Sequence, residues 1–177
     1  MKKVVINIVL IIVFIILYLL TINFFSWFKI AGVMPNLFVI FVLFIGLYTT
    51  RINGAVYGVI LGLLLDLFIG KNIGISAIML GMVGAIAGTF DKNFSKESRI
   101  TIILMVLIST IIFEVGSYTI RYFIYRMDPQ IGTFIQILLI ETLYNVLITI
   151  VIYPLMQNVG YKIEEEYKGN KILTRYF

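Results

Sequence analysis

The amino-acid sequence predicts an all-α integral membrane protein whose six transmembrane helices form one compact bundle. Of its 177 residues, 61% are hydrophobic and 13% are charged, whereas a soluble domain is about half apolar and about a quarter charged. The apolar residues form continuous runs, long enough for helices that cross about 30 Å of hydrocarbon. A third observation is that basic residues are distributed unequally between alternate loops, which is typical of a chain that crosses the membrane repeatedly.

The first predicted helix covers residues 4–25 and follows the basic pair Lys2 and Lys3. Its apolar run is longer than the core of a signal peptide, which has about 7–15 residues. No cleavage site with small residues at the usual spacing follows it. We therefore expect a signal-anchor helix that is retained in the protein.

Five further spans are predicted over residues 35–50, 52–69, 73–90, 100–124 and 131–156. The breaks between the later spans combine turn-forming residues with charged residues, as a chain leaving the membrane requires. Residues 157–177 are predicted to form a short cytoplasmic tail. Its run of three glutamates favours a solvated helix end, and a surface that binds a protein is the alternative.

The loop charges predict that both termini are cytoplasmic. With six spans and an inside start, ten basic residues fall on the inner side and four on the outer side, which accounts for all 14 lysines and arginines. The four outer ones are Lys29, Lys71, Arg121 and Arg126. An excess of basic residues in cytoplasmic loops sets the orientation of membrane proteins.

The composition excludes several kinds of chemistry. The chain has no cysteine and no histidine, so disulfides, thiolate nucleophiles, imidazole bases and the usual zinc sites are absent. No glycine-rich phosphate loop is present, and the basic residues form no patch suited to nucleic acid. We expect a protein that is not an enzyme and that holds no cofactor and no metal.

Glycines recur every four residues in the third predicted span, in a row that also contains an aspartate. The row consists of Gly54, Gly58, Gly62, Asp66 and Gly70. The fourth span offers a facing surface of small residues: Gly74, Ala77, Gly81, Gly84, Ala85 and Gly88. Residues four apart share a helix face, and small residues let two helices approach closely in lipid. The sequence predicts a tightly packed antiparallel hairpin, and it leaves open whether the same glycines form a homodimer.

Asp66 is the one acidic residue in this row. A carboxylate inside a span is costly unless it is neutral, paired or near water. It lies about one turn from the predicted outer end of its span, so we expect a structural role. The two candidate roles are capping the turn between Gly70 and Gly74 and fixing the register of a partner helix.

The last two spans carry polar residues on one face each. Glu114 and Arg121 belong to the fifth span, and Glu141 and Asn145 to the sixth. In the predicted topology both glutamates lie roughly 14 Å deep. They could share a proton, pair with Arg121 or line a water-filled pocket. The alternative is that each is neutral or hydrogen bonded within the bundle. We expect an outward-facing polar cavity bounded by Glu114, Arg121, Glu141 and Asn145, suited to a small ligand or to a residue of a partner.

The combination of these motifs resembles a known family. Its residues are Pro35-Asn36-Leu37 at the start of the second span, the glycines from Gly54 to Gly58, the segment Gly62-Leu63-Leu64-Leu65-Asp66, and the later Gly70, Gly74, Gly84 and Gly88. Together they resemble MreD, the rod shape-determining membrane protein. The diagnostic part lies within residues 35–88, while the resemblance in length and layout covers the whole chain.

The resemblance implies a non-enzymatic scaffold in the inner membrane of a bacterium. Such proteins bind MreC, a single-span protein, and through it link filaments of MreB to peptidoglycan synthesis by RodA and a penicillin-binding transpeptidase. The family is also similar in fold to the six-helix substrate-binding (S) components of energy-coupling-factor vitamin transporters.

Two other functions remain open. A substrate-binding S component would use the expected cavity, but such subunits usually carry small residues in their first helix, and here no alanine precedes Ala31. A membrane-embedded enzyme is disfavoured because no catalytic motif is present.

Overall fold

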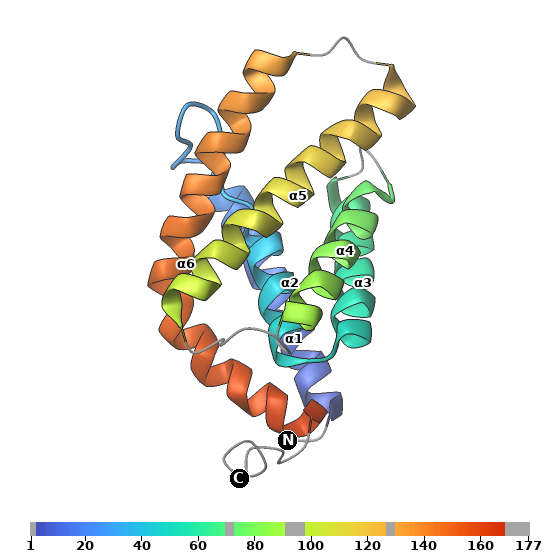
Figure 1. Cartoon of the computed structure of the whole chain (residues 1–177), viewed down its shortest axis with the longest axis vertical. Helices are drawn as coiled ribbons and strands as arrows, with labels where there is room; N and C mark the ends of the chain where they lie inside the picture. The colour runs from blue at the N-terminus through green and yellow to red at the C-terminus, as the bar shows by residue number, and fades with distance from the viewer. Residues whose placement is uncertain (1–2, 70–72, 91–97, 127–129, 169–177) are drawn as a thin grey trace.

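The computed structural model describes residues 3–69, 73–90, 98–126 and 130–168. These residues form six α-helices and no strand, and a single bridge joins Ile30 to Val33. The helices are α1 (Lys3–Asn23), α2 (Leu37–Tyr48), α3 (Arg51–Ile69), α4 (Ile75–Phe90), α5 (Arg99–Tyr125) and α6 (Ile131–Lys168) (Figure 1). The all-helical class and the number of helices predicted from the sequence are confirmed.

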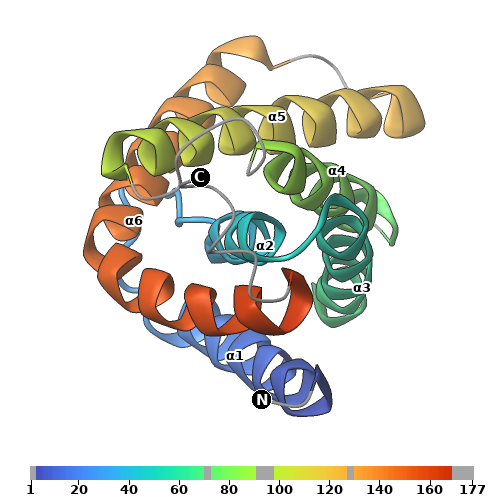
Figure 2. The ribbon, with the colours of Figure 1, turned by 60° about the horizontal axis from the view of Figure 1, so that its bottom comes forward.

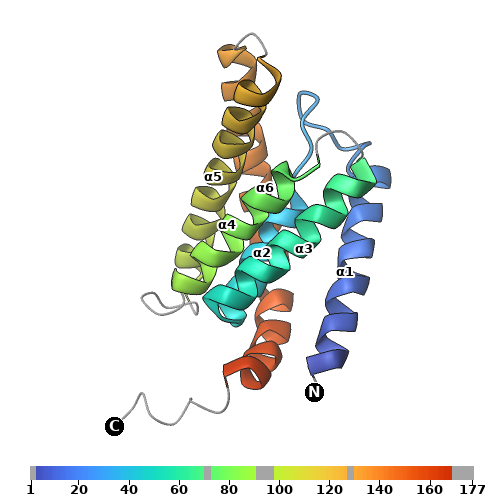
Figure 3. The same ribbon diagram turned by 90° about the vertical axis from the view of Figure 1, so that its right-hand side faces the viewer.

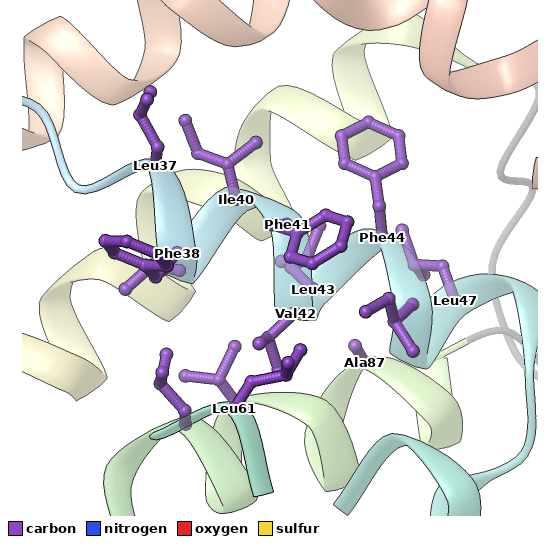
Figure 4. Close-up of a cluster of buried hydrophobic side chains, with 14 of the residues drawn as sticks. Leu37, Phe38, Ile40, Phe41, Val42, Leu43, Phe44, Leu47, Leu61 and Ala87 are labelled. Carbon is purple, nitrogen blue, oxygen red and sulfur yellow. The ribbon is translucent and has the colours of Figure 1, made fainter. Parts of the chain in front are cut away.

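Helix α2 lies in the middle of the molecule, with the other five helices around it (Figure 2). All twelve of its residues are buried. The helix is apolar on every side, a pattern that fits a helix enclosed by others. Its side chains leave the backbone in opposite directions, as Figure 4 shows for Ile40, Val42 and Phe44. The core of the bundle is therefore built around α2.

The surrounding helices expose large apolar side chains. On α1, Ile8, Ile12 and Ile16 are about half exposed and lie four residues apart, so they form one stripe. Apolar surface of this extent is unusual on a soluble monomer and is expected for a surface in contact with lipid tails. The exposed apolar surface thus agrees with a protein that lies in a membrane.

Four helices, α1, α3, α5 and α6, are long and apolar enough to cross a membrane. The other two, α2 and α4, are shorter apolar helices of 12 and 16 residues, which span about 18 and 24 Å. The expectation of six full-length spans therefore holds for four of the six helices by this criterion. Because α2 is enclosed by protein, its ends meet other parts of the chain and it needs no full-length contact with lipid.

Helix α6 continues past residue 156, where the sequence suggested that the membrane domain ends. It contains Pro154 and runs to Lys168. A proline removes one hydrogen bond of a helix and commonly bends it, and the last part of α6 turns across the end of the bundle at which α1 begins (Figure 1). The division into a membrane domain and a tail stays a prediction.

The turned end of α6 is bound to three other helices. The Tyr167 hydroxyl lies 2.6 Å from the hydroxyl of Tyr57 and donates to the side-chain oxygen of Asn7. Lys168 donates to the carbonyl of Leu47 at 3.1 Å. The first residue of α1 and the last of α6 therefore lie at one end of the bundle, an arrangement compatible with termini on one side of the membrane.

At the opposite end, α5 and α6 extend beyond the other helices (Figure 3). The segment between α1 and α2 makes a tight turn there, in which Ala31 and Gly32 have φ of 48° and 82°. Positive φ at both central residues is typical of a type I′ turn. The turn is joined to the bundle by Tyr144, whose hydroxyl donates to the carbonyl of Phe28 at 2.9 Å.

Candidate functional site

The first candidate site is the contact between α3 and α4, where backbones meet with almost no side chains between them. Gly54, Gly58 and Gly62 face α4 along this line. A Cβ atom added at Gly62 would lie 2.5 Å from the Ser76 carbonyl oxygen and from the Ala77 Cα. Added Cβ atoms at Gly54 and Gly58 would also lie within 3 Å of backbone atoms of α4. We call this contact, with the α4 residues that face it, the glycine seam.

The α4 side of the glycine seam uses its glycines in different ways. A Cβ at Gly84 would collide with the backbone of Gly54, and one at Gly88 would lie 2.6 Å from the Cα of Arg51. Gly81 faces the side chain of Val59, which can shift more easily than a backbone.

Gly74 has another role. It has open space around it and a φ of +102°, so its function is to turn the chain into α4. Gly70 lies outside the described residues.

A further glycine belongs to this seam, although the sequence analysis did not single it out. A Cβ on Gly46 of α2 would lie 2.5 Å from the Gly84 carbonyl oxygen and 2.7 Å from the Ala87 Cβ. Gly46 also lies directly against Gly54. Three helices therefore meet where Gly46, Gly54 and Gly84 come together. The sequence feature that could have indicated this contact is that Gly46 is the single glycine in an otherwise apolar helix.

Asp66 caps the start of α4. Its Oδ2 accepts hydrogen bonds from the backbone N–H of Gly74 at 2.8 Å and of Ala77 at 3.3 Å, and the residue is 5% exposed. The first N–H groups of a helix have no partner within the helix, so a side-chain oxygen there satisfies them. Of the two roles expected for Asp66, the structure shows capping, at the Gly74 end of the turn.

Asn145 ties three helices together. Its side-chain oxygen accepts a hydrogen bond from the Asn36 N–H at 2.8 Å, and its amide group donates to the Thr110 hydroxyl at 3.0 Å. Asn36 in turn caps α2, because its side-chain oxygen accepts from the N–H of Val39. Asn145 is fully buried, so it holds the start of α2 against α5 and α6 from inside the bundle.

The other motif residues take ordinary packing positions. Leu37 is buried in the core, Leu64 is partly buried against it, and Leu63 is 39% exposed. Pro35 precedes the cap of α2 and lines the cavity described next.

The second candidate site is a cavity at the end of the bundle opposite the first residue of α1. Its volume is about 710 Å³. The segment 31–36 and side chains from all six helices line it. Of the four residues expected around a cavity, it is lined by Glu114, Arg121 and Glu141, while Asn145 lies behind the wall. The remaining polar lining residues are Thr21, Asn36, Ser76, Thr133 and Gln136.

The two glutamates meet inside this cavity. The carboxyl groups of Glu114 and Glu141 lie within hydrogen-bonding reach of each other, and the side chain of Asn36 is a further neighbour of Glu141. A hydrogen bond between two carboxyl groups needs a proton on one of them, because a carboxylate can only accept. Arg121 acts on both from a greater distance; its own side chain is exposed.

Among the described residues, no group of three or more His, Cys, Asp or Glu side chains could hold a metal ion. The chemistry that the cavity offers is that of two carboxyl groups, an arginine at some distance and several neutral polar groups, within walls that include Phe38 and Phe113. Such a site is suited to bind a polar group carried on an apolar stem.

The family model described as rod shape-determining protein MreD matches residues 1–160. No curated protein matches the chain, and no solved structure matches it.

Proposed function

The chain belongs to the MreD family of rod shape-determining proteins, and from this membership we propose that it is a non-enzymatic scaffold subunit of the machinery for cell elongation. In this proposal it binds an MreC-like single-span protein. Through that protein it helps to link filaments of MreB to peptidoglycan synthesis by RodA and a penicillin-binding transpeptidase.

The observation that carries the proposal is the extent of the family match, which covers residues 1–160 and so all five helices before α6 and most of α6. The glycine seam supports it, because close helix contacts give a rigid body on which partners can assemble. We propose the bacterial cell (inner) membrane as the location, with both termini in the cytoplasm.

Removal of the protein from its host tests the role in cell shape. Depletion should turn rod-shaped cells round, and the wild-type chain supplied in trans should restore rods. Affinity purification from native membranes should recover a protein with one span and a coiled coil. Recovery of an ATPase pair with its coupling subunit would favour an energy-coupling-factor S component, for which the cavity volume of about 710 Å³ is suitable.

The orientation can be tested with single cysteines, since the chain has none of its own. Trp27 is 88% exposed in the segment between α1 and α2, and Glu165 is exposed near the end of α6. A membrane-impermeant maleimide applied to spheroplasts should label Trp27→Cys directly and Glu165→Cys only after the membrane is permeabilised. The reverse pattern would contradict cytoplasmic termini.

A further inference from the structure

The cavity contains a buried acceptor that has no donor. Glu141 is 7% exposed, and its Oε1 has no hydrogen-bond partner among the described residues. A buried polar atom without a partner costs free energy, more so when it carries charge. Such a group in a cavity wall is satisfied when a ligand brings a hydrogen-bond donor.

The neighbouring groups favour a positively charged donor. Glu114 lies beside Glu141, so two carboxyl groups converge on one place. Arg121 does not supply the missing donor, because it is exposed and makes no ion pair within 4 Å among the described residues. It lies seven residues beyond Glu114 on α5, which is about 10 Å along the helix. The cavity therefore has its acceptors at depth and a separate positive charge near its mouth.

The remaining walls suit a long aliphatic stem. Phe38, Phe113 and Ile137 line the cavity together with the polar groups. Lysine and arginine bury their methylene groups along apolar surface and place their charge at the end. A volume of about 710 Å³ accommodates one such side chain together with part of the chain that carries it.

We propose that this cavity receives a lysine or arginine side chain from a membrane-anchored partner polypeptide, whose ammonium or guanidinium group donates to Glu141 and Glu114. This inference rests on the proposed function, because it takes the ligand to be part of a protein partner. The exposed aromatic residues at this end of the bundle, such as Trp27 and Tyr125, are of the kind that lie at a membrane interface. The mouth of the cavity would then lie close to the membrane interface, where a membrane-anchored partner segment can reach it.

Photo-crosslinking in cells tests the inference. Gln136 is exposed and lines the cavity, so p-benzoylphenylalanine at this position should crosslink to the occupant. The expected product is an adduct with one membrane protein, mapped by mass spectrometry to a segment next to a lysine or arginine. Glu141→Gln and Glu114→Gln should each lower the yield at least about tenfold, because loss of one partner of a buried charge pair strongly weakens binding. Glu165→Gln, on the exposed surface of the same helix as Glu141, should leave the yield unchanged.

A charge exchange sharpens the test. Glu141→Lys should abolish the adduct, and replacement of the identified basic residue of the partner by glutamate should restore it. An unchanged yield in both glutamine variants would overturn the inference, as would adducts with lipid or with a small amine only. If the wild-type chain restores cell shape and recovers its partner while the glutamine variants do so equally well, the cavity proposal fails and the proposed function stands. If the wild-type chain recovers no such partner, the proposed function itself fails.

Discussion

The α3–α4 hairpin brings two backbones together, whereas the α5–α6 hairpin brings polar side chains together. In the glycine seam, Gly54 and Gly58 touch the backbone of α4 directly. By contrast, six of the eight buried polar residues in the described part of the chain belong to α5 and α6: Ser109, Thr110, Ser117, Glu141, Asn145 and Thr149. The two hairpins are thus held by different forces in one apolar environment.

The two hairpins also differ in how many of their buried polar groups have hydrogen-bond partners. Asp66 at the end of the glycine seam accepts two backbone hydrogen bonds. On α5 and α6, buried atoms of Ser117, Tyr118, Glu141 and Thr142 have no hydrogen-bond partner among the described residues. The Asp66 carboxylate at the seam thus has its hydrogen-bond donors within the chain. The α5–α6 hairpin, in contrast, has buried polar atoms that could still bind a further group. In the proposal made here for the cavity, α3 and α4 therefore provide a rigid contact, and α5 and α6 provide the groups that bind a partner.

Gly58→Ala tests the seam most severely. Its Cβ would meet the carbonyl of Leu80 and lie 2.8 Å from the N of Gly81, so the helices must separate. We expect the free energy of unfolding to fall by more than about 3 kcal/mol, or the protein to fail to insert. Unfolding in mixed detergent micelles, followed by circular dichroism, measures the change. Gly132→Ala is the matched control, since Gly132 is also helical but an added Cβ there would have no atom within 4 Å. The free energy of unfolding of this variant should be unchanged or slightly higher. Equal behaviour of the two variants would contradict the seam.

Asn145→Ala should have the second largest effect. It removes the acceptor for the Asn36 N–H and the donor to Thr110, leaving buried groups unpaired. We expect a loss of about 2–3 kcal/mol, measured by the same unfolding experiment. Asn158→Ala, at an exposed position of the same helix, should change stability by less than about 0.5 kcal/mol. A mild effect of Asn145→Ala would mean that α2 is held in place by packing alone.

Asp66→Ala should cost about 1–2 kcal/mol, because the first N–H groups of α4 lose their acceptor. Asp66→Asn keeps an oxygen at the same place and should recover at least half of this loss. Unfolding curves of the two variants measure both free-energy changes. If asparagine is as harmful as alanine, the negative charge of Asp66 matters beyond the cap.

Glu141→Gln should have the smallest effect on stability. The amide keeps the shape of the side chain and removes a buried ionisable group, so we expect the free energy of unfolding to stay within about 1 kcal/mol of the parent. Partner capture should nevertheless fall, which is the opposite of the pattern expected at Asp66. A large loss of stability in Glu141→Gln would place this residue with the structural groups of the molecule.

The sequence predicted those parts of the molecule that depend on local spacing. The four-residue period of glycines identified the contact between α3 and α4, since spacing on one helix directly determines which residues share a face. The matching depths of Glu114 and Glu141 followed from counting residues along two neighbouring spans, and the structure brings these two side chains together. Capping was one of the two roles expected for Asp66 from its distance to a glycine turn, and the structure shows it accepting hydrogen bonds at the start of α4.

Other parts depended on contacts between segments far apart in the sequence. Asn145 was expected in the wall of the cavity, but its partner is the backbone of Asn36, 109 residues earlier, and no pattern in either segment indicates this pair. Gly46 was missed because its row contains no second glycine. The short length of α2 also has a tertiary cause, since the other helices enclose it and all of its residues are buried.

The burial of α2 has a consequence for the order of assembly. This helix is made second but is covered on its last side by α6, whose Asn145 holds its first residues in place. In chain order α2 therefore precedes the helix that completes its enclosure, and until α6 forms, the side of α2 that α6 will cover needs another apolar neighbour such as lipid tails. Its all-round apolar surface suits that temporary environment as well as the final one, because lipid is as apolar as leucine. The apolar surface of α2 is therefore compatible with the bilayer until α6 completes the bundle.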